Sequence, residues 1–237
     1  MALPINSTPI YTLTVPSTKK EVKFRPFLIK EEKSLLIAQQ SEDTSVMVDS
    51  LKDVIKSCIK DEINVNTLAT FDLEYIFTQI RARSVGEIID LTLRCDTCTD
   101  EKAVATVHID ITKLKVDFPT EHKTKIELFD DVGIAMKYPT MEVVKKLESL
   151  DTTDINSVFD IVVECIDYIY NSSEVFAAKD QSKTELMDFL NNLTSEQFER
   201  VQTFFETMPK LKHSIDYTCP ICNKEHHKVL EGLNSFF

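Results

Sequence analysis

Two pairs of cysteines, each separated by two residues, are the side chains of this sequence best suited to chemistry. The first pair is Cys95 and Cys98, and the second is Cys219 and Cys222. Two thiolates at this spacing on a hairpin tip can bind one metal ion, and four thiolates complete the tetrahedral coordination of zinc. Such a set leaves no open position for a substrate. The pattern therefore predicts a structural zinc site made by all four cysteines.

The two pairs are far apart in the chain, and other interpretations of them stay open. Between Cys98 and Cys219 lie 120 residues, whereas a simple zinc ribbon has a gap of roughly 15–20 residues. A local site could instead use Cys219 and Cys222 with His226 or His227, or the thiols could bind no metal. A redox pair is disfavoured, because that chemistry needs its first cysteine at a helix N-terminus, and both pairs follow predicted strands.

The order of the predicted elements offers a way to bring the two pairs together, because it repeats along the chain. Residues 1–114 and 123–237 each begin with a hairpin, continue with amphipathic helices and end in strands that carry a Cys-x-x-Cys pair, and residues 115–122 link them. Identity between the halves is poor, so the repeat is inferred from element order and a few matched positions. We predict an α+β fold with an internal duplication, whose halves pack as one pseudo-two-fold unit.

Hydrophobic periodicity places the elements within each half. In the first half we predict strands at 10–15, 21–27, 89–94 and 105–111, and helices at 30–40, 48–59 and 71–84. In the second half we predict strands at 125–129, 134–139, 215–219 and 228–230, and helices at 141–150, 158–169, 184–192 and 194–208. Capping-box spacing marks two helix starts, at Ser182 with Glu185 and at Thr194 with Gln197.

No other group of side chains indicates catalysis or cofactor binding. Asp130-Asp131 falls in a predicted turn, where aspartates cap their own backbone, and Glu31-Glu32 falls in a first helical turn, where acids suit the helix dipole. Cys58 and Cys165 lie in apolar helical stripes and are predicted to be small buried hydrophobes. The 3 glycines are scattered, whereas phosphate-binding loops need clustered glycines. We therefore predict no catalytic residues, no cofactor-binding residues and no enzyme.

Composition narrows the classes of partner. The net charge is -12 with 39 acidic residues, which argues against nucleic acid or an anionic membrane surface as the main partner. No apolar stretch approaches the roughly 20 residues that span a bilayer, and residues 1–6 lack the features of a secretory signal. We expect a protein kept in a reducing cytoplasm, where cysteines are thiols or metal ligands rather than disulfides.

One segment carries a family resemblance. Residues 22–38, which read VKFRPFLIKEEKSLLIA, resemble the opening of a baseplate hub family of T-even-type contractile-tailed phages, and residues 3–17 fit as well. The length, the Cys-x-x-Cys pairs and the helical middle also agree with this family. Outside the opening segment the agreement is in architecture more than in residue identity. The resemblance implies a virion or tail-assembly protein of the baseplate hub, made in the host cytoplasm, that binds neighbouring tail proteins in a multi-subunit assembly. It supplies no catalytic residues.

Two other functions compete with a structural or assembly role in a baseplate. A zinc-stapled cellular adaptor or regulatory protein would need a basic face, and the charge balance argues against one. A hydrolase would need a dispersed site, and no Ser, His and Asp set is evident in the sequence, although triads need not be local.

Overall fold

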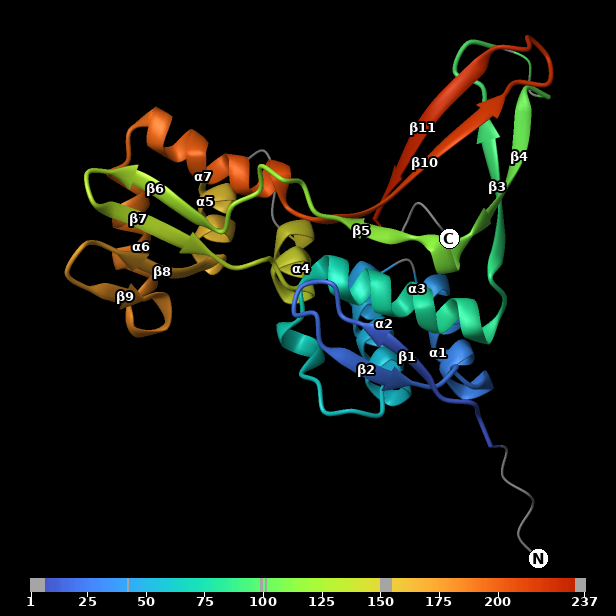
Figure 1. Cartoon of the computed structure of the whole chain (residues 1–237), viewed down its shortest axis with the longest axis horizontal. Coiled ribbons are helices and arrows are strands. Elements are labelled where there is room, and N and C mark those ends of the chain that lie inside the picture. Colours follow the sequence, from blue (N-terminus) through green and yellow to red (C-terminus); the bar gives the residue numbers. More distant parts are fainter. Residues whose placement is uncertain (1–6, 42, 99, 101, 150–154, 233–237) are drawn as a thin grey trace, which may run out of the picture. The chain divides into compact units, whose positions relative to one another are not determined.

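The computed structural model describes residues 7–41, 43–98, 100, 102–149 and 155–232. It mixes helices and strands, as predicted for an α+β protein. The chain divides into two compact units (Figure 1). The first contains the described parts of Met1–Val65, Phe71–Asp117 and Lys210–Phe237, and the second contains those of Asn66–Thr70 and Phe118–Pro209. Among the described residues, no helix combines the length and apolar character that crossing a membrane requires.

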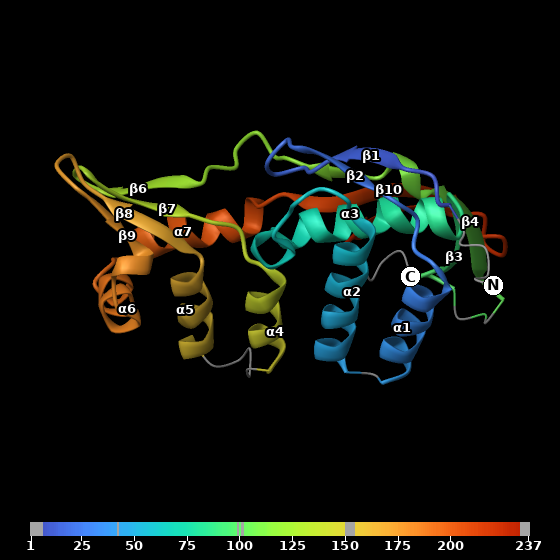
Figure 2. The same cartoon turned by 90° about the horizontal axis from the view of Figure 1, so that it is seen from below.

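The first unit opens with a hairpin and three α-helices. Strands β1 (Tyr11–Thr14) and β2 (Glu21–Phe24) pair in antiparallel register, and α1 (Ile29–Gln40), α2 (Thr44–Cys58) and α3 (Thr70–Ser84) follow. The 3₁₀-helix η1 (Val65–Thr67) lies before α3, where residues 66–70 are assigned to the second unit. Helix α2 starts where the Asp43 side chain accepts hydrogen bonds from two backbone N–H groups. Helices α1 and α2 lie side by side (Figure 2). These elements match the predicted helices of the first half.

Two further hairpins of the first unit share one core. One consists of β3 (Ile88–Arg94) and β4 (Val104–Asp110), followed by the 3₁₀-helix η2 (Ile111–Lys113). The other consists of β10 (Lys210–Thr218) and β11 (Glu225–Glu231), and β10 also pairs with β5 (Lys115–Asp117). Inward side chains of the hairpins form a cluster of Ile89, Leu93, Ile109, Leu211, Ile215, Tyr217 and Leu230. Ala82 of α3, Ile111 of η2 and Leu114 after η2 belong to the same cluster. This shared core places the two hairpins side by side (Figure 1).

The second unit is a four-stranded antiparallel sheet with helices packed on it. Its strands are β6 (Lys125–Phe129), β7 (Val132–Met136), β8 (Ile166–Tyr170) and β9 (Val175–Ala177), in that spatial order. Its helices are α4 (Met141–Ser149), α5 (Ile155–Glu164), α6 (Lys183–Asn191) and α7 (Ser195–Thr207), and η3 (Ala178–Asp180) is a short 3₁₀-helix. Figure 2 shows α5 and α6 on one side of the sheet. The two predicted capping boxes are confirmed at the starts of α6 and α7.

Two element predictions were wrong. The helix expected over 158–169 ends at Glu164, and β8 takes the residues that follow. The apolar positions at this boundary suit both helical and strand spacing, and β8 gains its backbone hydrogen bonds by pairing with β7. The expected linker 115–122 begins with a strand, β5.

The compact units divide the chain differently from the halves at 1–114 and 123–237. The β10–β11 hairpin comes from the second half of the sequence, yet it belongs to the first unit because β10 pairs with β5 and shares its core with β3 and β4. The internal duplication is a statement about the order of elements, and it stays a prediction.

Candidate metal centre

Each Cys-x-x-Cys pair begins at the residue that follows a strand. At the end of β3, the Cys95 N–H donates to the Ala103 carbonyl oxygen at 2.8 Å. At the end of β10, the Cys219 N–H donates to the Lys224 carbonyl oxygen at 2.9 Å. Asn223 closes this second loop with a positive φ of 55°, a conformation that asparagine tolerates better than most residues. The hairpins thus present both cysteine pairs at their tips.

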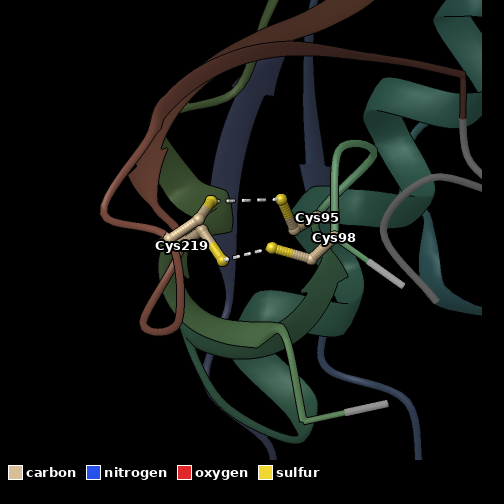
Figure 3. Close-up of side chains that lie close together, drawn as sticks. Cys95, Cys98 and Cys219 are labelled. Carbon is tan, nitrogen blue, oxygen red and sulfur yellow. Dashed lines mark hydrogen bonds between the residues drawn. The ribbon is translucent and has the colours of Figure 1, made fainter. Parts of the chain in front are cut away.

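The structure brings the four predicted cysteines together within the first unit. Their sulfur atoms all lie within 4.8 Å of one another. The Cys95 and Cys222 Sγ atoms are 3.9 Å apart, and the Cys98 and Cys219 Sγ atoms are 3.8 Å apart. Each of these close contacts joins one hairpin to the other, as the facing side chains in Figure 3 illustrate.

These separations fit a single tetrahedral ion. With metal–sulfur bonds of about 2.3 Å, tetrahedral geometry places neighbouring sulfurs about 3.8 Å apart. The two cross-hairpin distances, 3.9 and 3.8 Å, agree with that edge length. An iron–sulfur cluster would attach the cysteines to different iron atoms and hold their sulfurs farther apart. A thiolate set of this shape can hold zinc. That the four cysteines bind zinc stays a prediction.

Little apolar surface holds the two tips together. The cluster around the sulfurs contains only Cys95, Ala103 and Cys219 as buried members among the described residues, with Cys98 packed against it. Cys95 and Cys219 are 3% and 0% exposed, whereas Cys222 is exposed to solvent. The apolar cluster between the tips therefore consists mainly of the cysteines themselves.

The thiols differ in how readily they ionise. Hydrogen bonds from the Thr97 hydroxyl and from backbone N–H groups lower the pKa of Cys95 to about 5, although burial opposes this shift. The hydrogen bond with Cys222, together with burial, raises the pKa of Cys98 to about 12. A divalent cation would favour the thiolate form of all four, because the cation offsets the repulsion between negative sulfurs.

The two neighbouring histidines have different surroundings. The His226 Nε2 atom lies 3.2 Å from the Cys95 sulfur on the opposite hairpin, and the His227 Nδ1 atom lies 2.7 Å from an Asp216 carboxylate oxygen. In the described part of the chain, the group of potential ligands consists of the four cysteines without either histidine. The geometry therefore favours the shared four-sulfur set over a local site with an imidazole ligand. No pattern in the sequence identified the hydroxyl of Thr97 as a partner of Cys95.

The other side chains considered in the sequence analysis make contacts that stabilise the fold or are buried in the core. Asp131 accepts a hydrogen bond from the Ser172 N–H at 3.0 Å, and Glu31 forms a buried ion pair with Arg25. The prediction that Cys58 and Cys165 are small buried hydrophobes is confirmed, since each is 0% exposed. Burial raises the pKa values of these two thiols to about 11 and about 12.

Comparison with known proteins identifies a family and a relative. A family model described as "T4 bacteriophage base plate protein" matches residues 8–237. The "Baseplate hub assembly protein gp26" of Enterobacteria phage T4 is 24% identical over 228 residues, which cover 96% of this chain and 97% of that relative. No solved structure matches the chain significantly. The family match includes both units and all four clustered cysteines.

Proposed function

The chain belongs to the T4 bacteriophage base plate protein family, and we propose that it is a non-enzymatic structural subunit or assembly factor of a phage tail baseplate hub. The proposal includes a structural zinc ion bound by Cys95, Cys98, Cys219 and Cys222. The similarity to a hub assembly protein supports the hub as its place of action, because it runs through almost the whole of both chains. Its partners would be neighbouring tail and baseplate proteins, and it would be made in the host cytoplasm.

The observation that carries the zinc proposal is the convergence of four sulfurs from two hairpins within 4.8 Å. Four protein ligands fill a tetrahedral coordination sphere and leave no position for a reacting water or substrate. The ion would act as a cross-link between the hairpin tips, whose own apolar cluster is small. Metal binding would then contribute directly to the free energy of folding of this region.

The distribution of charge supports protein partners. Residues 118–209 contain 18 acidic and 8 basic side chains, a net charge of −10, so they carry most of the net charge of -12 of the whole chain. A surface of this sign repels nucleic acid and anionic lipid, and it attracts partners with basic faces. The competing interpretation, a zinc-stapled cellular adaptor, has no comparable support, because the family match is to a phage baseplate protein.

Metal analysis of the purified protein tests the zinc proposal. Protein prepared under reducing conditions without added metal should contain one zinc ion per chain, as measured by inductively coupled plasma mass spectrometry. Cys219→Ser should lose the ion, because it removes a ligand that is 0% exposed. Cys165→Ala, which removes an equally buried thiol outside the cluster, should keep it. Absence of zinc from the wild-type protein would remove the zinc from the proposal and leave the assembly role standing.

Complementation tests the assembly role. Cells infected with a phage that lacks this gene should form no complete tails, and supplying the wild-type protein should restore them in electron micrographs of the lysate. Restoration by Cys165→Ala but not by Cys219→Ser would connect the metal centre to assembly. Normal tails without the gene would contradict the proposed role. Mass spectrometry of purified virions would then distinguish a retained subunit from a transient assembly factor.

A further inference from the structure

One cross-strand pair of the second hairpin contacts two consecutive residues of the first. Tyr217 and His226 are direct partners in the β10–β11 register, and their rings stack with centroids 5.0 Å apart at an interplanar angle of 15°. The Tyr217 hydroxyl donates to the Arg94 carbonyl oxygen at 3.0 Å. The His226 Nε2 atom lies 3.2 Å from the Cys95 sulfur. The pair thus connects β10 and β11 to the start of the first cysteine loop.

We propose that His226 is a positioning residue for the metal centre, which donates an Nε2–H hydrogen bond to the Cys95 sulfur and thereby strengthens metal binding. The inference rests on the proposed zinc site and adds a residue that is not a ligand. Residues outside the coordination sphere that orient ligands and adjust their charge commonly affect metal affinity.

The direction of the hydrogen bond follows from the chemistry of a bound thiolate. A thiolate has no proton to donate, so the imidazole nitrogen facing it must carry one. Four thiolates around a divalent ion have a combined charge of about −2, since each sulfur contributes one negative charge. An N–H donor draws electron density from Cys95 and stabilises this excess charge. The Thr97 hydroxyl, 3.2 Å from the same sulfur, is a second group able to donate to it.

The neighbouring histidine provides a matched control. Successive residues of a strand point to opposite faces, and His227 contacts the carboxylate of Asp216 at 2.7 Å, whereas His226 contacts Cys95. Replacing either histidine by phenylalanine removes an imidazole from the same strand. Only at position 226 does the change remove a donor to a sulfur.

The test compares His226→Phe, His226→Gln and His227→Phe with the wild-type protein. Phenylalanine keeps a flat ring against Tyr217 but has no N–H, and glutamine keeps an N–H donor but has no ring. Zinc affinity is measured by competition with a chromophoric chelator, and Co²⁺ substitution reports the energy of the sulfur-to-metal charge-transfer band. We expect His226→Phe to weaken zinc binding by about 10-fold and to shift the band to lower energy. His226→Gln should largely retain both properties, and His227→Phe should match the wild type.

The outcomes separate this inference from the zinc proposal. A His226→Phe variant that equals the wild type in affinity and band energy would overturn the role of His226. Equal weakening in His226→Phe and His227→Phe, or a larger loss in His226→Gln than in His226→Phe, would also overturn it, because ring packing or general stability would then explain the effect. A wild-type protein that binds neither zinc nor Co²⁺ would refute the metal site itself.

Discussion

The buried ion pair between Arg25 and Glu31 fixes the start of α1 in the first unit. The Arg25 Nη2 atom lies 2.9 Å from a Glu31 carboxylate oxygen, and the other carboxylate oxygen accepts from the Leu28 N–H at 2.7 Å. Burial opposes ionisation of Glu31, but the hydrogen bonds from Arg25 and Leu28 and the charge of Arg25 outweigh it and lower the pKa. The carboxylate is therefore the form that the folded protein stabilises.

This arrangement predicts a pH-dependent effect of Glu31→Gln. Because the folded pKa lies below the ordinary value of 4.5, the charge contributes stability above the unfolded pKa, and the contribution is lost as pH falls through the folded pKa. We expect the variant to lose about 1–3 kcal/mol of unfolding free energy at neutral pH and the difference to shrink below pH 4.5. Urea denaturation across this range measures it, with Glu32→Gln as the control. An equal loss at every pH would contradict the assignment.

The residues of the candidate centre were predictable only in part. The cysteines could be identified because a Cys-x-x-Cys spacing is itself a signal for metal binding. The contact between His226 and Cys95 joins residues 131 positions apart, and no local pattern in the sequence encodes it. It depends on how the two hairpins pack through their shared core.

At the scale of elements, local signals predicted the starts of α6 and α7 but not the β8–β9 hairpin. The Ser182–Glu185 and Thr194–Gln197 capping boxes work because both partners lie within one helical turn. The last part of the helix predicted over 158–169 was wrong because β8 is selected by pairing with β7, a contact between distant residues. Where a short apolar run suits either spacing, tertiary pairing decides the outcome.

A second prediction concerns the hairpins as elements. Removing the metal with a chelator should speed backbone hydrogen exchange near the tips of β3–β4 and β10–β11, because few apolar contacts besides the sulfurs hold these tips together. The sheet of the second unit should be unaffected, since the four cysteines lie in the first unit. Exchange followed by mass spectrometry with and without chelator provides the measurement. Equal protection of the tips in both samples would argue against the metal ion as a cross-link between the hairpins.

At the scale of the whole molecule, charge is distributed unevenly along the chain. Residues 118–209 have a net charge of −10. If this region binds basic faces of tail proteins, association should weaken as salt rises from about 0.1 M to about 0.5 M, because the screening length shortens. Co-purification from infected cells at the two salt concentrations measures this. Retention of all partners at high salt would indicate apolar interfaces instead.

The division into units was not predictable from the sequence. It depends on β5, a strand of three residues that gives little periodic signal, and on its pairing with β10. Because this pairing joins positions almost a hundred residues apart, the hairpin β10–β11 could not be assigned to the first unit from local patterns. Hydrophobic periodicity did predict the broad α+β class, since apolar residues recur at both helical and strand spacings.

The pairing of Asp117 with Lys210 has a consequence for biosynthesis. Residues 118–209 emerge from the ribosome before β10, so the second unit is translated while the first still lacks the partner of β5 and two of its sulfurs. Domains generally fold as units during translation. Synthesis of the first unit thus begins first and ends last. A nascent chain released after Pro209 would lack β10 and β11, so the apolar core of the first unit would be exposed to proteolysis.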